Sequence, residues 1–184
     1  KSNFNNNEII RQKLLTQYPK YGNDVAWVDN LGLKWAKKFS GEVSSFKNAR
    51  GGKCHTGFYT VSAHVPMGQN VGATPDGRFS GAPLADGGLS AVYGRDVNGP
   101  TALLKSVGRI DSMLGSNGTL LNMKFLPSFF NTKEDIRKFS FLLKGLVKLK
   151  ISHAQFNVVN KDDLLKAQKE PEKYRNLTIR VAGY

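Results

Sequence analysis

The chain has 184 residues, of which 40% are hydrophobic and 22% charged, a composition typical of globular proteins. Its 27 basic and 14 acidic side chains give a formal net charge of +13. No apolar run approaches the roughly 20 residues of a membrane span, and the first residues lack the apolar core of a signal peptide. The start also lacks an initiator methionine, which suggests a fragment. We therefore expect one soluble, cytoplasmic domain without membrane association.

The basic residues are scattered along predicted helices and accompany no known DNA- or RNA-binding motif. Solvated helix faces explain them, so no nucleic-acid partner is expected. Acidic groups outside this chain would neutralise part of the positive charge.

The N-terminal quarter is predicted to be helical. Residues 8–17 place apolar side chains on one helix face behind asparagines that can cap it, and Pro19 ends this helix. A second helix is predicted to begin at Asn23 or Asp24, with apolar residues spaced three and four apart. These are Val25, Val28, Leu31, Trp35 and Phe39.

The middle of the chain is rich in glycine and proline. A turn is predicted over 48–53 and a short buried strand over 58–63. Residues 66–100 show little periodicity, but apolar residues are interleaved through them, which indicates an ordered loop system. Within it, Pro75-Asp76-Gly77 predicts a tight turn, and the glycine spacing fits no phosphate-binding loop.

Strands and helices alternate in the second half. Short strands are predicted over 101–107, 119–125, 151–159 and 177–181. Thr132 and Asp135 resemble a capping box for a helix that ends near residue 146, and a further helix from Asp162 or Asp163 to 174 is interrupted at Pro171. This alternation predicts an α/β layer architecture.

Few side chains indicate chemistry on their own. Cys54 is the only cysteine, so no internal disulfide or zinc constellation is expected, and a lone cysteine fits a small structural residue. The remaining candidates are histidines without metal-ligand spacing, and isolated carboxylates that could serve as general acids or form turns. They are His55, His64, His153, Asp86, Asp96 and Asp111.

The final five residues, Arg180-Val181-Ala182-Gly183-Tyr184, carry the most informative motif. They resemble the radical-bearing loop of an enzyme family that stores a radical on a glycine Cα, which can become planar because glycine has no Cβ. Five residues alone also fit a strand that ends in a flexible glycine. Several blocks upstream decide between these readings.

Taken in order, these blocks resemble the C-terminal part of the glycyl radical enzymes, the superfamily that includes pyruvate formate-lyase and the radical dehydratases. The blocks are 19–24, 51–53, 57–59, 62–66, 72–78, 83–87, 98–102, 117–125, 155–159 and 180–184. The resemblance implies part of a ten-stranded α/β barrel made of two antiparallel half-barrels, incomplete in this chain. Residues 1–55 would be the helical C-terminal part of the large barrel region. Residues 56–184 would be the glycine radical domain, truncated just after the radical glycine, with its radical loop at 177–184.

The same resemblance implies a mechanism. Gly183 would carry the radical, and Arg180, Val181, Ala182 and Tyr184 would form the loop that an activating enzyme recognises. That activase would be a radical S-adenosylmethionine iron–sulfur enzyme, with no cofactor bound by this chain itself. The stored radical would pass to a cysteine, whose thiyl then attacks the substrate. The intact enzyme is expected to be a homodimer in the cytoplasm of an anaerobe.

The sequence also departs from the family's pattern, and these differences bear on what the chain can do alone. No Cys-x-Glu loop is present, Cys54 does not match it, and the chain stops one residue past Gly183, where the family continues. We therefore expect the thiyl cysteine in an N-terminal remainder, and the fragment alone to be inactive. Residues 84–90 and Ala182 resemble dehydratases and other carbon–heteroatom lyases more than the alternative, a formate C-acetyltransferase (pyruvate formate-lyase). A non-catalytic radical-domain spare part and a basic binding module are the alternatives of another class.

Overall fold

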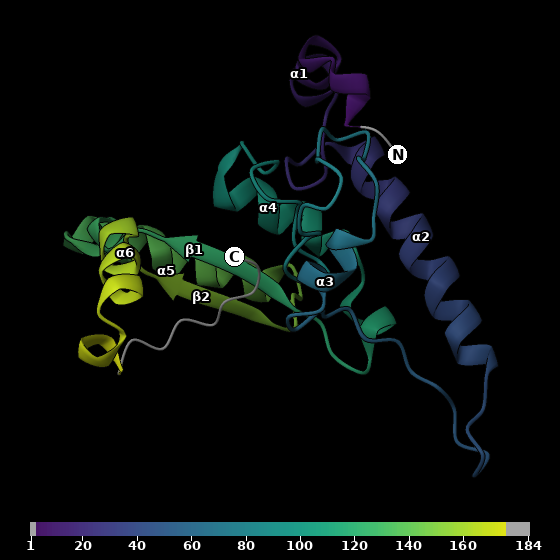
Figure 1. Cartoon of the computed structure of the whole chain (residues 1–184). Helices are drawn as coiled ribbons and strands as arrows, with labels where there is room; N and C mark the ends of the chain where they lie inside the picture. The colour runs from purple at the N-terminus through teal and green to yellow at the C-terminus, as the bar shows by residue number, and fades with distance from the viewer. Residues whose placement is uncertain (1–2, 176–184) are drawn as a thin grey trace.

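The computed structural model describes residues 3–175 and shows a mixed helix and sheet architecture (Figure 1). In chain order its main elements are α1 (Glu8–Thr16), α2 (Ala26–Ser45), α3 (His64–Gln69), α4 (Gly99–Gly108), β1 (Leu121–Phe125), α5 (Lys133–Lys148), β2 (Ala154–Val158) and α6 (Lys161–Lys169). Short 3-10 turns lie at Phe4–Asn6 (η1), Ser112–Gly115 (η2), Pro127–Phe130 (η3) and Pro171–Tyr174 (η4). The strand expected over 177–181 lies outside the described residues.

Side-chain caps set the starts of three helices. The Asn7 side chain accepts a hydrogen bond from the backbone N–H of Ile10 at 3.2 Å, at the start of α1. Thr132 Oγ1 accepts from the N–H of Asp135 at 3.1 Å, and this confirms the predicted cap of α5. Asn160 caps α6 in the same way, and Pro171 separates α6 from η4 as predicted.

The two strands lie side by side in parallel, and α5 connects them as a crossover. Both strand predictions, over 119–125 and 151–159, are confirmed with shorter bounds. On one side of β1, Phe125 packs against four other phenylalanines, with ring centroids 5.1–6.1 Å apart. These are Phe129, Phe130, Phe139 and Phe156. The aromatic cluster fixes α5 and η3 on the sheet.

Residues 99–108 form the helix α4, so the strand predicted over 101–107 is wrong. Pro100 lies in the first turn, where its missing N–H costs nothing. Leu103, Leu104 and Val107 then follow at helical spacing, and all three are buried in the hydrophobic core. Helical burial of these side chains outweighs the β-branched character of the segment.

The strand predicted over 58–63 is also wrong. Only Phe58 pairs with a neighbouring segment, in a single parallel bridge to Thr119. The chain then turns, because the N–H of Ala63 donates to the carbonyl of Thr60 at 2.8 Å and Val61 adopts a φ of +52°. The predicted turn over 48–53 is confirmed, closed by the N–H of Asn48 donating to the carbonyl of Gly52.

Helix α2 is present, but it begins at Ala26 and not with Asn23 or Asp24 as the cap, and its apolar side is not in the core. Asp29, Ala36 and Ser40 are buried against α4 and η2. The expected apolar face is largely exposed, with Trp35 at 65% and Phe39 at 54% of their full accessible area. The side that contacts the rest of the described chain is therefore small and polar.

Candidate functional site

The motif that carries the predicted chemistry lies outside the described residues. This holds for Gly183 and for its neighbours Arg180, Val181, Ala182 and Tyr184. Within residues 3–175, the glycine-rich loop system of residues 71–98 and the cavity beside it form the most elaborate site.

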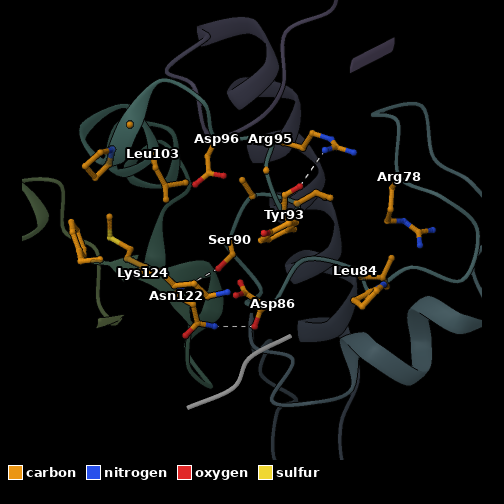
Figure 2. A pocket seen from close by; sticks show the side chains of 18 of the residues that line it. Arg78, Leu84, Asp86, Ser90, Tyr93, Arg95, Asp96, Leu103, Asn122 and Lys124 are labelled. Carbon is orange, nitrogen blue, oxygen red and sulfur yellow. Dashed lines mark hydrogen bonds between the residues drawn. The ribbon is translucent and has the colours of Figure 1, made fainter. Parts of the chain in front are cut away.

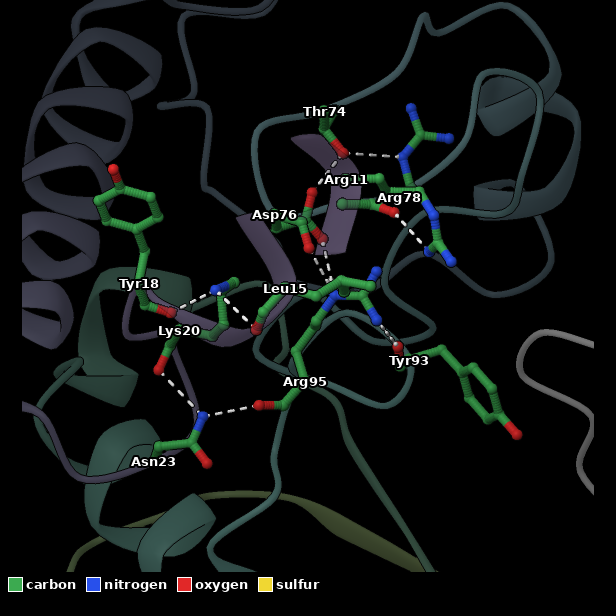
Figure 3. A network of polar contacts seen from close by, with 11 residues as sticks. Arg11, Leu15, Tyr18, Lys20, Asn23, Thr74, Asp76, Arg78, Tyr93 and Arg95 are labelled. Atoms are coloured by element: carbon green, nitrogen blue, oxygen red, sulfur yellow. Dashed lines mark hydrogen bonds and ion pairs between the residues drawn. The ribbon is translucent and has the colours of Figure 1, made fainter. Parts of the chain in front are cut away.

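Arg78 holds the first part of this loop system together (Figure 3). Its side chain is 4% exposed. The guanidinium donates to the carbonyl oxygens of Ala82, of Gly72 at 2.5 Å and of Val71 at 3.3 Å. Its Nε donates to Thr74 Oγ1 at 3.3 Å. Because these acceptors are backbone and hydroxyl oxygens, the arginine closes the loop and is not displayed toward an anion.

The predicted turn at Pro75-Asp76-Gly77 is confirmed. The N–H of Gly77 donates to the carbonyl of Thr74 at 3.0 Å, and Gly77 has a φ of +87°, which suits glycine. Nothing in this turn resembles a phosphate cradle.

A second arginine joins the loop to the connection between α1 and α2. Arg95 Nε donates to the carbonyl of Asp76 at 2.8 Å and lies 3.4 Å from its carboxylate. The amide nitrogen of Asn23 donates to the carbonyl oxygens of Arg95 and Lys20, at 2.6 and 3.1 Å. Burial lowers the pKa of the Lys20 amine, and the charge of Arg95 acts in the same direction. These contacts fix the loop before it reaches the cavity.

The cavity has a volume of about 1190 Å³ and lies between this loop, α4 and β1 (Figure 2). Its wall is largely apolar, with Leu84, Leu103 and Phe125 among the lining residues. Polar side chains interrupt that wall, among them Asp86, Ser90, Asp96, Asn122 and Lys124. An apolar pocket with a few converging polar groups is the usual form of a binding site.

Asp96 is the most perturbed carboxyl of this cavity. Burial raises the pKa of Asp96, the nearby charge of Asp86 raises it further, and the charge of Lys124 opposes both effects. Burial at this position therefore disfavours the charged form of Asp96. The structure thus brings together two carboxylates that were isolated in the sequence. Asp111, by contrast, forms a turn, because it caps η2 by accepting from the N–H of Met113.

Asn122 of β1 connects the two sides of the cavity. Its Nδ2 donates to the carbonyl of Asp86 at 3.0 Å, and its backbone N–H donates to Ser90 Oγ at 3.2 Å. The buried Oδ1 has no hydrogen-bond partner among the described residues. Sequence reasoning missed Asn122 and Lys124 as site residues, because nothing within the block 117–125 singles them out and only the folding of β1 beside the loop places them here.

The remaining candidates have structural contacts. His55 Nδ1 lies 2.9 Å from Ser116 Oγ, and His153 Nδ1 lies 3.0 Å from the carbonyl of Thr119. Cys54 is a half-buried free thiol. Within residues 3–175, no group of three or more His, Cys, Asp or Glu side chains could hold a metal ion. In the same range, no helix has the length and apolar character to cross a membrane.

Two family models match the chain. Residues 85–184 match the family described as "Glycine radical", and residues 1–68 match the one described as "Pyruvate formate lyase-like". The first match covers more than half of the chain and includes the C-terminal motif with Gly183.

Curated relatives come from the same group. The chain is 39% identical to a probable dehydratase, YbiW, of Escherichia coli, over 96% of this chain and 23% of the relative. It is 39% identical to an isethionate sulfite-lyase of Nitratidesulfovibrio vulgaris, over 100% of this chain and 22% of the relative. This chain thus spans less than a quarter of the length of these relatives.

Solved structures agree with the fold. A B12-independent glycerol dehydratase of Clostridium butyricum, solved with glycerol bound, matches with a TM-score of 0.88 at 46% identity, over 95% of this chain and 22% of that one. A glycyl radical enzyme of Archaeoglobus fulgidus matches with a TM-score of 0.90 at 36% identity, over 99% of this chain and 23% of that one. The chain therefore belongs to the glycyl radical enzyme family.

Proposed function

We propose that this chain is the C-terminal segment of a glycyl radical lyase of the dehydratase type, and that Gly183 stores the radical. The observation that carries the proposal is the Glycine radical family match, which runs through residue 184 and so contains Gly183. A radical at this residue needs a Cα that can become planar, and glycine alone offers one without a side chain.

The proposed chemistry has two transfers. A radical S-adenosylmethionine iron–sulfur activase recognises the loop from Arg180 to Tyr184 and removes one hydrogen atom from the Gly183 Cα. In turnover, a cysteine thiol outside this chain returns a hydrogen atom to Gly183, and the resulting thiyl removes hydrogen from the substrate. The chain's own contribution is to position and shield the stored radical, and it binds no cofactor.

The reaction class rests on similarity. The relatives are named as a dehydratase and a sulfite-lyase, both of which break bonds between carbon and a heteroatom. Ala182 before the proposed radical glycine also resembles such lyases. The match of residues 1–68 to the pyruvate formate lyase-like family keeps a formate C-acetyltransferase as the alternative.

The proposed assembly follows from the same family. Residues 1–55 would complete a large barrel region of ten strands in two half-barrels, and residues 56–184 would form the glycine radical domain. The N-terminal remainder of the polypeptide would supply the thiyl cysteine, and the intact enzyme would be a homodimer in the cytoplasm of an anaerobe. This fragment alone would be inactive.

The test is electron paramagnetic resonance of the full-length protein after anaerobic treatment with its activase. We expect a doublet from one Cα hydrogen, and we expect Gly183→Ala to abolish it while Gly81→Ala, in the glycine-rich loop, keeps it. A doublet that persists in Gly183→Ala would refute the assignment. Turnover by residues 1–184 alone after activation would refute the dependence on an external cysteine.

A further inference from the structure

Helix α5 carries most of its positive charge on one side. Four of its basic residues lie within about 60° of one another around the helix axis, at 3.6 residues per turn. They are Lys133, Arg137, Lys144 and Lys148, and all four are exposed. They extend over roughly 22 Å of the helix. We call these four residues, together with the exposed Phe141 beside them, the α5 basic stripe.

The opposite side of α5 packs on the core. Phe139, Leu142 and Leu146 lie against the buried cluster, and the rings of Phe139 and Phe156 of β2 are 5.2 Å apart. Figure 1 shows α5 alongside the two strands. These apolar side chains are centred about 170° around the helix axis from the α5 basic stripe. The stripe therefore faces away from the sheet.

An exposed aromatic ring orders the cations of the stripe. Phe141 is 54% exposed, and Arg137 Cζ and Lys144 Nζ lie 5.6 and 5.2 Å from its ring centroid. These cation–π contacts hold both charges around one ring. Glu134 Oε2 lies 3.7 Å from an Arg137 amino nitrogen. Among the residues that the structure describes, no carboxylate forms an ion pair with the three lysines of the stripe.

The stripe suits the surface of a longer polypeptide as well as that of this chain. Lysine and arginine are almost never fully buried unless carboxylates pair with them, because their desolvation is costly. A second copy of the same stripe would repel this one, since both are positive. A row of exposed cations instead attracts an acidic surface and raises the rate at which it binds.

We propose that the α5 basic stripe is the docking surface for an acidic patch on the activating enzyme. This rests on the proposed function, in which an activase removes a hydrogen atom from Gly183. The stripe lies within residues 85–184, the segment that matches the Glycine radical family and contains Gly183. A protein that acts on Gly183 must approach this segment. Long-range attraction between charges favours such a brief encounter without a large apolar interface.

The experiment uses the full-length enzyme and its activase, mixed anaerobically without S-adenosylmethionine so that no radical forms. Biolayer interferometry measures the association rate and the Kd. We expect Lys144→Glu combined with Lys148→Glu to raise the Kd at least about tenfold at about 50 mM salt, mainly through slower association. Most of that difference should disappear at about 500 mM salt, where charges are screened.

Two matched pairs of variants complete the test. Lys144→Arg with Lys148→Arg keeps the charge and should keep the affinity. Lys13→Glu with Lys34→Glu makes the same change in net charge at exposed positions of α1 and α2, and should raise the Kd less than about twofold. Circular dichroism and thermal melts verify that each variant folds.

Three outcomes would overturn the proposal. The first is an unchanged Kd in the Lys144→Glu and Lys148→Glu pair, and the second is an equal loss of affinity in the Lys13→Glu and Lys34→Glu pair. The third is a stripe that binds a DNA or RNA oligonucleotide, with that binding alone lost in the variants. A nucleic acid is the poorer occupant, because no nucleic-acid-binding motif accompanies these residues.

Because the binding measurement needs no radical, its result is independent of Gly183. Stripe-dependent binding of the activase without a glycyl doublet would overturn the assignment of Gly183 alone. A normal doublet with binding that ignores the stripe would overturn this inference alone.

Discussion

Replacing Arg78 by methionine tests whether one buried guanidinium holds the glycine-rich loop. Methionine keeps much of the length and apolar stem of arginine but donates no hydrogen bonds. In the native loop the guanidinium supplies donors to three backbone carbonyls and to the hydroxyl of Thr74. All of these acceptors lose their arginine partner at once.

The magnitude follows from the count of acceptors and their burial. A buried acceptor left without a partner costs about 1–3 kcal/mol. The carbonyl-bearing residues Gly72 and Ala82 are half-buried and Val71 is exposed, so water can reach part of the gap and the lower end of that range applies. We expect Arg78→Met to lower the free energy of unfolding by about 3–5 kcal/mol, a large part of the roughly 5–15 kcal/mol that a domain typically has.

Urea unfolding followed by circular dichroism at 222 nm measures this loss. Tryptophan fluorescence is less suitable, because Trp27 and Trp35 are already exposed in the folded protein. Native-state hydrogen exchange at Gly81, whose N–H donates to the carbonyl of Val71, reports the local effect. Arg50→Met, at an exposed position in the turn over 48–53, is the matched control and should stay within about 0.5 kcal/mol of wild type. A loss below about 1 kcal/mol in Arg78→Met, or one equal to the control, would refute the assigned role.

Three further changes probe the core, the cavity and the loop. Leu104→Ala in the buried face of α4 should lower the free energy of unfolding by about 2–5 kcal/mol in urea titrations, and a loss under 1 would contradict its place in the core. Because burial raises the pKa of Asp96, the folded state holds its proton longer, and the free energy of unfolding should fall as pH rises from about 4 through the raised value. Asp96→Asn should remove that slope and stabilise the protein at neutral pH, and an unchanged slope would count against the burial. Gly88→Ala places a Cβ 2.0 Å from the carbonyl carbon of Phe58 and should cost about 1–3 kcal/mol in thermal melts, whereas Gly41→Ala, with open space around it, should stabilise α2 slightly.

The starts of α1 and α5 could be predicted because the signals that set them are local, whereas α2 begins at Ala26 without a side-chain cap and not at Asn23 or Asp24 as predicted. Asn7 and Thr132 each accept a hydrogen bond from an N–H three residues ahead, so adjacent sequence determines where α1 and α5 begin. The break at Pro171 is local in the same sense. Strand assignments depend on partners far along the chain. Residues 58–63 have strand-like composition, but only Phe58 finds an extended neighbour, at Thr119.

The cavity could be predicted only in part, for a similar reason. Asp86 and Asp96 stand out in the sequence as loop carboxylates, yet their grouping with Asn122 and Lys124 depends on how β1 pairs with β2. The raised pKa of Asp96 comes from burial, which composition does not reveal. The proposal for Gly183 rests on the sequence alone, because residues 176–184 lie outside the described part of the chain.

The polar side of α2 explains why its exposed apolar side does not face the core. Asp29 is fully buried and accepts hydrogen bonds from Ser106 Oγ at 3.0 Å and from Arg109 of the segment that ends α4. Just before α2, Asp24 pairs with Lys105 and Arg109 at 2.9 and 2.8 Å, and the hydrogen bond from Lys105 lowers the pKa of Asp24.

The exposed apolar row of α2 consists of Trp27, Leu31, Trp35 and Phe39. Its centre lies roughly 140° around the helix axis from Asp29, at 3.6 residues per turn. Rotating α2 to bury it would separate the buried Asp29 from Arg109 and from Ser106, which both donate hydrogen bonds to it. The rotation would also move Ala36 and Ser40 out of their close contact with α4 and η2, where large aromatic side chains would have to replace them. The charged network therefore fixes which side of α2 faces inward, and the row of large apolar side chains stays on the exposed side.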